Sequence, residues 1–231
     1  MPLSKNALHL LKERYCHQGE NQRDVYKRVA GALSLGDTKF EKRLQKSMEN
    51  GIFLPNSPCI RNAGIKKGML HACFVLDIAD TMESISDTLK NMIIIFKNGG
   101  GVGINFSKLR SKNSLLSSGG TSSGVVSFMK LFDVATEVVK QGGFRRGALM
   151  GVLNFEHAEI IDFIRSKLIN QLTNFNISVL VSDKFMEKVE KGENIDLINP
   201  QDDKIWNTIN AKTIFDVIAF SAWNSGDPGF L

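Results

Sequence analysis

The spacing of apolar residues divides the chain into two parts. Up to residue 49 they recur at helical intervals, as in Val25, Val29 and Leu33. From Gly51 onward, short apolar runs alternate with amphipathic stretches and are punctuated by glycine, which is typical of β/α units. The pattern therefore predicts a helical region over 1–50, followed by an α/β domain over 51–231.

Within the second part, the apolar runs predict strands separated by helices. We expect strands over 72–78, 103–106, 149–154 and 176–181, and helices over 82–96, 125–140, 157–165 and 183–191. Because parallel strands need crossover connections, mostly parallel pairing is expected. Periodicity alone does not distinguish an open doubly wound sheet from a closed barrel.

Two polar segments rich in turn-forming residues, 110–124 and 199–210, are predicted to be loops. The first is long for a connection within a compact domain. Connections of that length usually carry function or move.

Composition supports a folded protein and excludes several classes. Apolar residues make up 42% and charged residues 23%, which is ordinary globular usage. The net charge is +5, but lysine and arginine are interspersed with nearly as many acidic residues. This favours a modest attraction for small polyanions, and leaves a nucleic-acid-binding protein as a weaker alternative.

The three cysteines, Cys16, Cys59 and Cys73, form no CxxC pair, which argues against a disulfide scaffold or a structural zinc site. A reducing cytoplasm is the expected compartment. The first residues lack the apolar core of an export signal, and no run of about 18 apolar residues occurs. The four histidines have no metal-ligand spacing, so no metal site is expected.

The glycine triplet 99–101 precedes a predicted strand and follows a predicted helix. A dinucleotide-binding loop has the reverse order, so that fingerprint does not apply. The triplet either presents bare backbone N–H groups to a ligand, or ends a helix before a tight turn.

Other candidate residues also have two interpretations. Cys73 is either a small core residue or a redox thiol at the end of a strand. Asp80 either caps the helix that begins near residue 82 or accepts a hydrogen bond from a ligand hydroxyl. Segment 141–147, QGGFRRG, is either a solvated turn or an anion contact.

Six blocks, taken in order, resemble the large catalytic subunit of ribonucleotide reductase. The residues of these blocks are most similar to those of the adenosylcobalamin-dependent class II enzymes, with class I subunits as the alternative. The blocks are NSPCIRNAG (56–64), HACFVLDIADTMESI (71–85), GGGVGINFSKLR (99–110), QGGFRRGALMGVL (141–153), TNFNISVLVSDKFM (173–186) and GDPGFL (226–231).

The resemblance implies a fold and a reaction. The family fold is a ten-stranded α/β barrel of two parallel half-barrels after a helical region, and this chain matches its first half. The reaction reduces ribonucleotides to deoxyribonucleotides by radical chemistry, with two thiols as reductant. Cys73 matches one of those catalytic thiols, and Ser57, Ala72, Cys73 and Gly101 match the substrate site.

The resemblance also implies allosteric control by a deoxynucleoside triphosphate. Asp80 and Arg110 match the effector site, where Asp80 accepts from the ribose and Arg110 pairs with phosphates. Lys167 and Asn170 belong to the matching second loop, 166–174. The implied partners are a second copy of the chain, the C-terminal half of the enzyme and a thioredoxin-like reductant, and the implied cofactor is adenosylcobalamin.

The sequence stops at Leu231, before the family's radical cysteine and most of its cobalamin contacts. The resemblance therefore predicts that this chain is inactive alone, and that half a barrel leaves a strand edge open to association. A nucleotide-binding regulatory module without chemistry is the alternative from another functional class.

Overall fold

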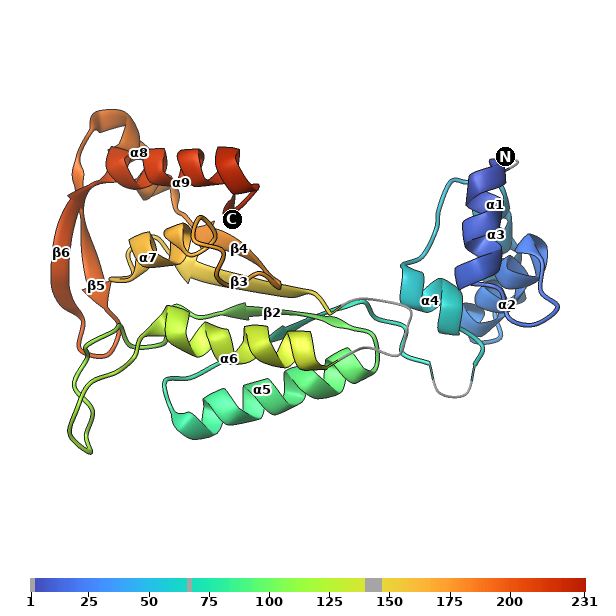
Figure 1. Ribbon diagram of the computed structural model, residues 1–231. Coiled ribbons are helices and arrows are strands. Elements are labelled where there is room, and N and C mark those ends of the chain that lie inside the picture. The colour runs from blue at the N-terminus through green and yellow to red at the C-terminus, as the bar shows by residue number, and fades with distance from the viewer. Residues whose placement is uncertain (1–2, 66–67, 140–146) are drawn as a thin grey trace. The chain divides into compact units, whose positions relative to one another are not determined.

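The computed structural model describes residues 3–65, 68–139 and 147–231, which divide into two compact units (Figure 1). The first comprises the residues up to Cys73 together with Asn98–Gly100, and its regular structure is helical. The second begins at Phe74 and contains a sheet with helices. The expected order of a helical region followed by α/β structure is confirmed.

Side-chain caps set the starts of the helices in the first unit. Ser4, Asn21, Asp37 and Asn56 each accept a hydrogen bond from a backbone N–H of the first turn, which satisfies donors that the helix itself leaves unpaired. The helices are α1 (Lys5–Arg14), α2 (Gln22–Ser34), α3 (Thr38–Glu49) and α4 (Ser57–Asn62).

Helix α2 supplies most of the core of the first unit. Its Val25, Tyr26, Val29 and Ala30 are buried, and α3 packs along it. The buried part of α4 belongs to the same cluster, through Cys59 and Ile60 among other residues. The helical unit therefore extends past Gly51, where the spacing of apolar residues changes.

The second unit contains a sheet of five described strands in the order β1-β2-β3-β4-β7. The pairs β2–β3, β3–β4 and β4–β7 are parallel. The elements are β1 (Cys73–Leu76), α5 (Met82–Lys97), β2 (Gly101–Asn105), α6 (Val125–Val138), β3 (Leu149–Asn154), α7 (Ile160–Arg165), β4 (Phe175–Leu180), α8 (Asp183–Lys191), β5 (Asn194–Asn199), β6 (Lys204–Asn210), α9 (Ala211–Ser225) and β7 (Gly229–Phe230).

The helices follow one another along this sheet. Helix α5 packs on α6, α6 on α7 and α7 on α9. Strands in chain order joined by helices that contact their chain neighbours are what successive crossovers in one rotational direction produce. The predicted fold class, a parallel half-barrel of α/β units, is confirmed.

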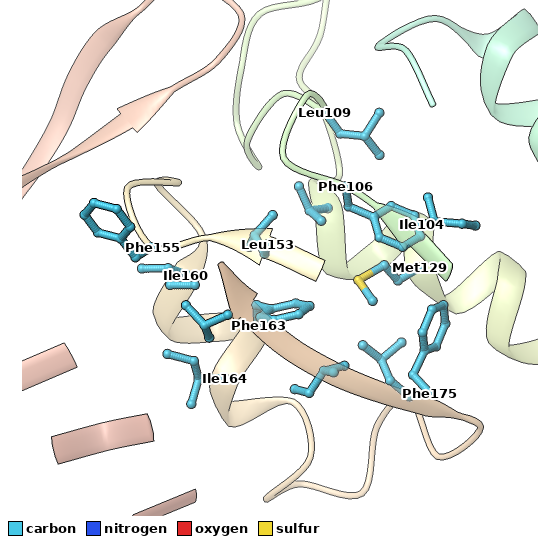
Figure 2. Close-up of a cluster of buried hydrophobic side chains, with 14 of the residues drawn as sticks. Ile104, Phe106, Leu109, Met129, Leu153, Phe155, Ile160, Phe163, Ile164 and Phe175 are labelled. Carbon is cyan, nitrogen blue, oxygen red and sulfur yellow. The ribbon is translucent and has the colours of Figure 1, made fainter. Parts of the chain in front are cut away.

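Aromatic packing fills the space between sheet and helices. The Phe106 ring lies edge-on to Phe132, with centroids 5.6 Å apart, and to Phe175, at 6.0 Å. Figure 2 shows Phe106 gathered with Met129 and Phe163, and Leu109 at the start of the next loop in the same cluster. The core thus anchors the chain at the carboxyl end of β2.

The expectation of a loop over 199–210 is wrong. Residues 204–210 form β6, which pairs antiparallel with β5 as a hairpin. The first five residues of β6 are exposed and the last two are half-buried. Because neither face of the strand is consistently buried, its sequence does not alternate between apolar and polar residues. Its Ile205, Trp206, Thr208 and Ile209 have high strand propensity, which is the local signal for a strand here.

Candidate functional site

Cys73 opens strand β1 and its side chain is exposed. The alternative that it is a core residue is therefore wrong. Cys59 is buried and Cys16 half-buried, and in both burial is the largest cause that raises the pKa of the thiol. Because the thiolate is the nucleophile in thiol exchange, Cys73 is the best placed of the three for redox chemistry.

Ser57, the first residue of α4, is exposed and is held from two directions. The Tyr15 hydroxyl donates to Ser57 Oγ at 3.2 Å, which leaves the serine proton available to another acceptor. The Arg28 guanidinium donates to the carbonyls of Ala63, at 2.6 Å, and Ile60, and pairs with Glu20 at 2.6 Å. This partly buried ion pair fixes the end of α4 and so the helix that carries Ser57.

The remaining predicted substrate residues fall on either side of the division between the units. Ala72 precedes Cys73 in the first unit and is half-buried, whereas Gly101 begins β2 in the second unit and is buried. Gly99 adopts a φ of 87°, two residues after α5 ends, which matches the helix-end interpretation of the triplet. Gly101 itself serves as the first residue of a strand.

Asp80 and Arg110 contact each other directly. The Asp80 carboxylate accepts from Arg110 Nε at 2.7 Å and from the Arg110 backbone N–H at 3.2 Å. The alternative role of Asp80 as a helix cap is wrong, because Thr81 Oγ1 accepts from the Ser84 backbone N–H at the start of α5. Both side chains are about a quarter exposed, so a ligand can reach the pair.

Lys167 and Asn170 lie far from that pair along the sheet. They precede β4, at its amino end, whereas Arg110 follows β2, beyond its carboxyl end. A strand of six residues spans roughly 20 Å. The Lys167 ammonium also turns inward, contacting the carbonyls of Leu172 and Phe175 and the Asp227 carboxylate at 3.3 Å. Asn170 is exposed and has a φ of 55°.

Three buried polar side chains that sequence reasoning did not select hold the loop after Arg110. His157 Nε2 lies 2.9 Å from the Leu109 carbonyl, and Asn199 Oδ1 accepts from the Ser111 backbone N–H at 3.0 Å. Glu159 Oε2 accepts from the backbone N–H groups of Lys112 and Val125, each at 2.8 Å. They carry no motif, and their partners lie 34 to 88 residues away in sequence.

Burial sets the protonation of two of these groups. Desolvation lowers the pKa of His157, and desolvation raises the pKa of Glu159 against the opposing backbone hydrogen bonds from Val125 and Lys112. The Glu159 backbone N–H donates to His157 Nδ1 at 3.0 Å. Because Nδ1 accepts, the neutral ring carries its proton on Nε2 and donates it to Leu109.

Within residues 3–65, 68–139 and 147–231, no cluster of three or more histidine, cysteine or acidic side chains is arranged to hold a metal ion. No helix there is long and apolar enough to cross a bilayer. Residues 141–146 of the candidate anion turn lie outside the described residues.

An all-helical unit followed by a parallel α/β half-barrel with an exposed cysteine on its first strand defines the class of protein. The family description "Ribonucleotide reductase, all-alpha domain" matches residues 1–68, and "Ribonucleotide reductase, barrel domain" matches residues 71–231. The chain belongs to the ribonucleotide reductase large-subunit family.

Named relatives agree with this assignment. The chain is 50% identical over 82% of its length to a vitamin B12-dependent ribonucleoside-diphosphate reductase of Thermoplasma acidophilum, covering 25% of that protein. It is 38% identical over its whole length to a protein of the same name from Mycobacterium tuberculosis, covering 36%. It is 35% identical over 73% of its length to a ribonucleoside-diphosphate reductase subunit alpha of Bacillus subtilis, again covering 25%. The chain thus spans about a quarter to a third of these relatives.

Proposed function

We propose that this chain supplies the amino-terminal part of a ribonucleotide reductase that converts ribonucleotides to deoxyribonucleotides. The observation that carries the proposal is the exposed Cys73 at the start of the first strand of a barrel of this family. A cytoplasmic location remains a prediction from cysteine usage.

The reaction requires a pair of thiols. Replacing the 2′-hydroxyl of a ribonucleotide by hydrogen takes two electrons and two protons, releases water, and converts two thiols to one disulfide. Cys73 is one of these thiols. In this proposal the second thiol and the radical-bearing cysteine come from residues outside this chain, because the resemblance assigns neither role to Cys16 or Cys59. A thioredoxin-like protein then reduces the disulfide.

In this proposal Ser57 holds the substrate's phosphate. An ionised phosphate only accepts hydrogen bonds, so a hydroxyl that binds it must donate. The Tyr15 hydroxyl occupies an acceptor site of Ser57 and leaves its proton free to do so. The resemblance also assigns the backbone at Ala72 and the backbone at Gly101 to substrate binding.

The cofactor of the proposed enzyme is adenosylcobalamin. Support comes from the names of the relatives, of which the Thermoplasma and Mycobacterium proteins are vitamin B12-dependent. When bound, this cofactor supplies the radical that starts the reaction. We assign none of the described side chains to it. A class I enzyme with a separate radical-generating subunit is the alternative, for which support comes from weaker similarity to proteins such as the Bacillus subunit alpha.

We further propose that Asp80 and Arg110 bind a deoxynucleoside triphosphate that selects the substrate, and that the working unit is a dimer. Within one chain, Lys167 and Asn170 lie at the opposite end of the sheet from Arg110, so a single nucleotide cannot readily reach both sets. Two copies of the chain would allow one nucleotide to contact both. Leu131, Val134 and Val138, which are exposed on α6 at helical spacing, offer an apolar face for a second copy.

A regulatory module that binds nucleotide without chemistry is the second candidate. It is favoured by the confinement of Asp80, Arg110, Lys167 and Asn170 to the second compact unit, separate from Cys73. Deoxynucleotide binding without product formation, even after the C-terminal part is supplied, would support it.

The decisive experiment combines this chain with the C-terminal part of the enzyme and measures deoxynucleotide formation with and without adenosylcobalamin. We expect product only with the cofactor, and none from the isolated chain. Cys73→Ser should abolish turnover, whereas the buried-site control Cys59→Ser should retain it. Turnover by Cys73→Ser, or by the isolated chain, would refute the assignment.

A further inference from the structure

The loop from 109 to 125 is fixed at its base and exposed at its tip. Residues 115–121 project to solvent and close on themselves through a bridge between Leu115 and Thr121. At the base, by contrast, Ser111 and Ser114 are buried. The part of the loop next to Arg110 is therefore the rigid part.

Glu159 closes this base with a single oxygen atom. Its Oε2 accepts from the N–H of Lys112, where the loop departs, and from the N–H of Val125, where α6 begins. Helix α6 has no side-chain cap of its own, because its cap residue is Gly124. The distant carboxylate takes that role, and its negative charge also lies at the favourable end of the helix dipole.

Gly124 makes this approach possible. Its φ of 88° and ψ of 172° lie in a region that only glycine readily adopts. A β-carbon at this position would lie 2.5 Å from Glu159 Oε1 and 2.6 Å from Oε2. A glycine at position 124 thus leaves the space that the Glu159 carboxylate occupies.

His157 and Asn199 hold the residues on either side of Arg110. The imidazole donates to the carbonyl of Leu109, and the Asn199 amide oxygen accepts from the N–H of Ser111 and from Ser114 Oγ at 3.2 Å. Asn199 is itself oriented by a hydrogen bond from its Nδ2 to Asp202 at 2.9 Å. All three supporting side chains are buried: His157, Glu159 and Asn199.

We propose that Glu159, His157 and Asn199 are positioning residues for the effector site, because they fix the peptide groups around Arg110 and so aim its guanidinium toward Asp80 and the phosphates of a bound nucleotide. The inference rests on the proposed function, since it presumes that Asp80 and Arg110 bind a deoxynucleoside triphosphate. None of the three is proposed to contact that nucleotide. Their effect is to keep the site in its binding arrangement before the ligand arrives.

The test measures two quantities on the 231-residue chain. One is the affinity for each of the four deoxynucleoside triphosphates by calorimetry, and the other is hydrogen exchange at the amides of Lys112 and Val125. The variants are Glu159→Ala, Glu159→Gln and Asn199→Ala, with Arg110→Ala as the direct-contact reference. Asp162→Ala, which removes an exposed acid from the same helix, is the matched control.

We expect Glu159→Ala to speed exchange at both amides and to weaken nucleotide binding about tenfold, within the usual range of coupling between sites. Asn199→Ala should weaken binding similarly while leaving the Val125 amide protected. Glu159→Gln should retain most of the affinity, because its amide oxygen can still accept. Asp162→Ala should change neither quantity.

Two failures are distinguishable. If the wild-type chain binds a nucleotide and Arg110→Ala weakens it, but Glu159→Ala and Asn199→Ala bind normally, the positioning role is wrong while the effector site stands. If the wild-type chain binds none of the four, or Arg110→Ala binds as well as wild type, the proposed effector function itself is wrong.

Discussion

The Asp80 carboxylate accepts two hydrogen bonds from Arg110, one from the side chain and one from the backbone. The two residues proposed to bind a nucleotide thus pair with each other. A bound triphosphate must share the guanidinium with Asp80, and the carboxylate must turn one oxygen toward a ribose hydroxyl.

The first prediction concerns this pair. Asp80→Ala should weaken deoxynucleoside triphosphate binding about tenfold or more, because it removes the ribose acceptor and the partner that orients Arg110. Calorimetric titration checks this. The exposed ion pair between Lys108 and Asp77, at 2.7 Å, provides the control, and Asp77→Ala should bind normally. Tighter binding by Asp80→Ala would mean that Asp80 only competes with the phosphates.

The second prediction concerns His157 and acid. Because burial lowers its pKa in the folded protein, the unfolded chain takes up a proton first as the pH falls below about 6.5. Stability is therefore fully present above that pH and declines below it, by up to about 1.4 kcal/mol per pH unit from this one group. Protonation of Nδ1 would also break the hydrogen bond from the Glu159 backbone.

Urea unfolding at pH 7.5 and 5.5 tests this prediction when wild type is compared with His157→Gln, which cannot titrate. The variant should be less stable at pH 7.5 but should lose less on acidification. Equal losses for both proteins would show that His157 does not titrate as its burial implies.

The third prediction concerns Glu159, whose linkage has the opposite sign. Burial raises its pKa, so the folded protein takes up the proton first as the pH falls toward the ordinary value of about 4.3. The stability contribution of this group is thus largest in acid and is lost as the pH rises through the folded pKa. The neighbouring Asp162 also raises this pKa, and Lys112 lowers it.

Glu159→Gln removes this titration. Relative to wild type, the variant should gain stability as the pH rises from 4.5 to 7.5, as measured by urea unfolding across that range. A constant difference between the two proteins would contradict the assignment. Glu190→Gln, which removes an exposed acid from α8, serves as the control for removal of a charge.

The fourth prediction concerns two glycines in the same loop. Gly120 has a φ of 89° and open space around its missing side chain, whereas Gly124 has a φ of 88° and the Glu159 oxygens within 2.6 Å. Gly120→Ala should cost about 1 to 2 kcal/mol from backbone strain alone. Gly124→Ala should cost about 3 kcal/mol or more, because a clash is added. Equal costs in thermal or urea unfolding would argue against the close approach of Glu159.

The fifth prediction concerns thiol reactivity. Iodoacetamide should alkylate the exposed Cys73 well before the buried Cys59, with Cys16 between them. Mass spectrometry of peptides from briefly treated protein measures the order. Modification of Cys59 first would contradict the placement of the Cys73 side chain.

Much of the fold follows from the sequence because its apolar periodicity reflects burial. The predicted bounds of β3 and α8, 149–154 and 183–191, match the structure residue for residue. Periodicity fails where strands are stabilised mainly by pairing. Strand β6 is mostly exposed and is held by its register with β5, which no local pattern encodes.

The residues of the candidate site also fall into two groups, those that the sequence identifies and those that only the structure reveals. The family resemblance identifies Asp80 and Arg110 as candidates, and the structure places them in contact. Sequence analysis does not identify His157 and Glu159, because a single buried polar residue has no sequence signature until its partners are known. The sequence predicts a loop at Asn199, and the hairpin shows why an asparagine is needed there.

The β5–β6 hairpin lies outside the main sheet, yet it contacts the loop beside Arg110. At its tip, Asn199 accepts a hydrogen bond from the Ser111 backbone N–H. In its turn, the Gln201 side chain donates to the carbonyl of Leu115 at 3.1 Å. If Asp80 and Arg110 bind an effector as proposed, substitutions in this turn should change the nucleotide preference without altering any atom that touches the nucleotide. Related enzymes that diverge in selectivity while keeping Asp80 and Arg110 are therefore expected to differ in the 199–203 turn.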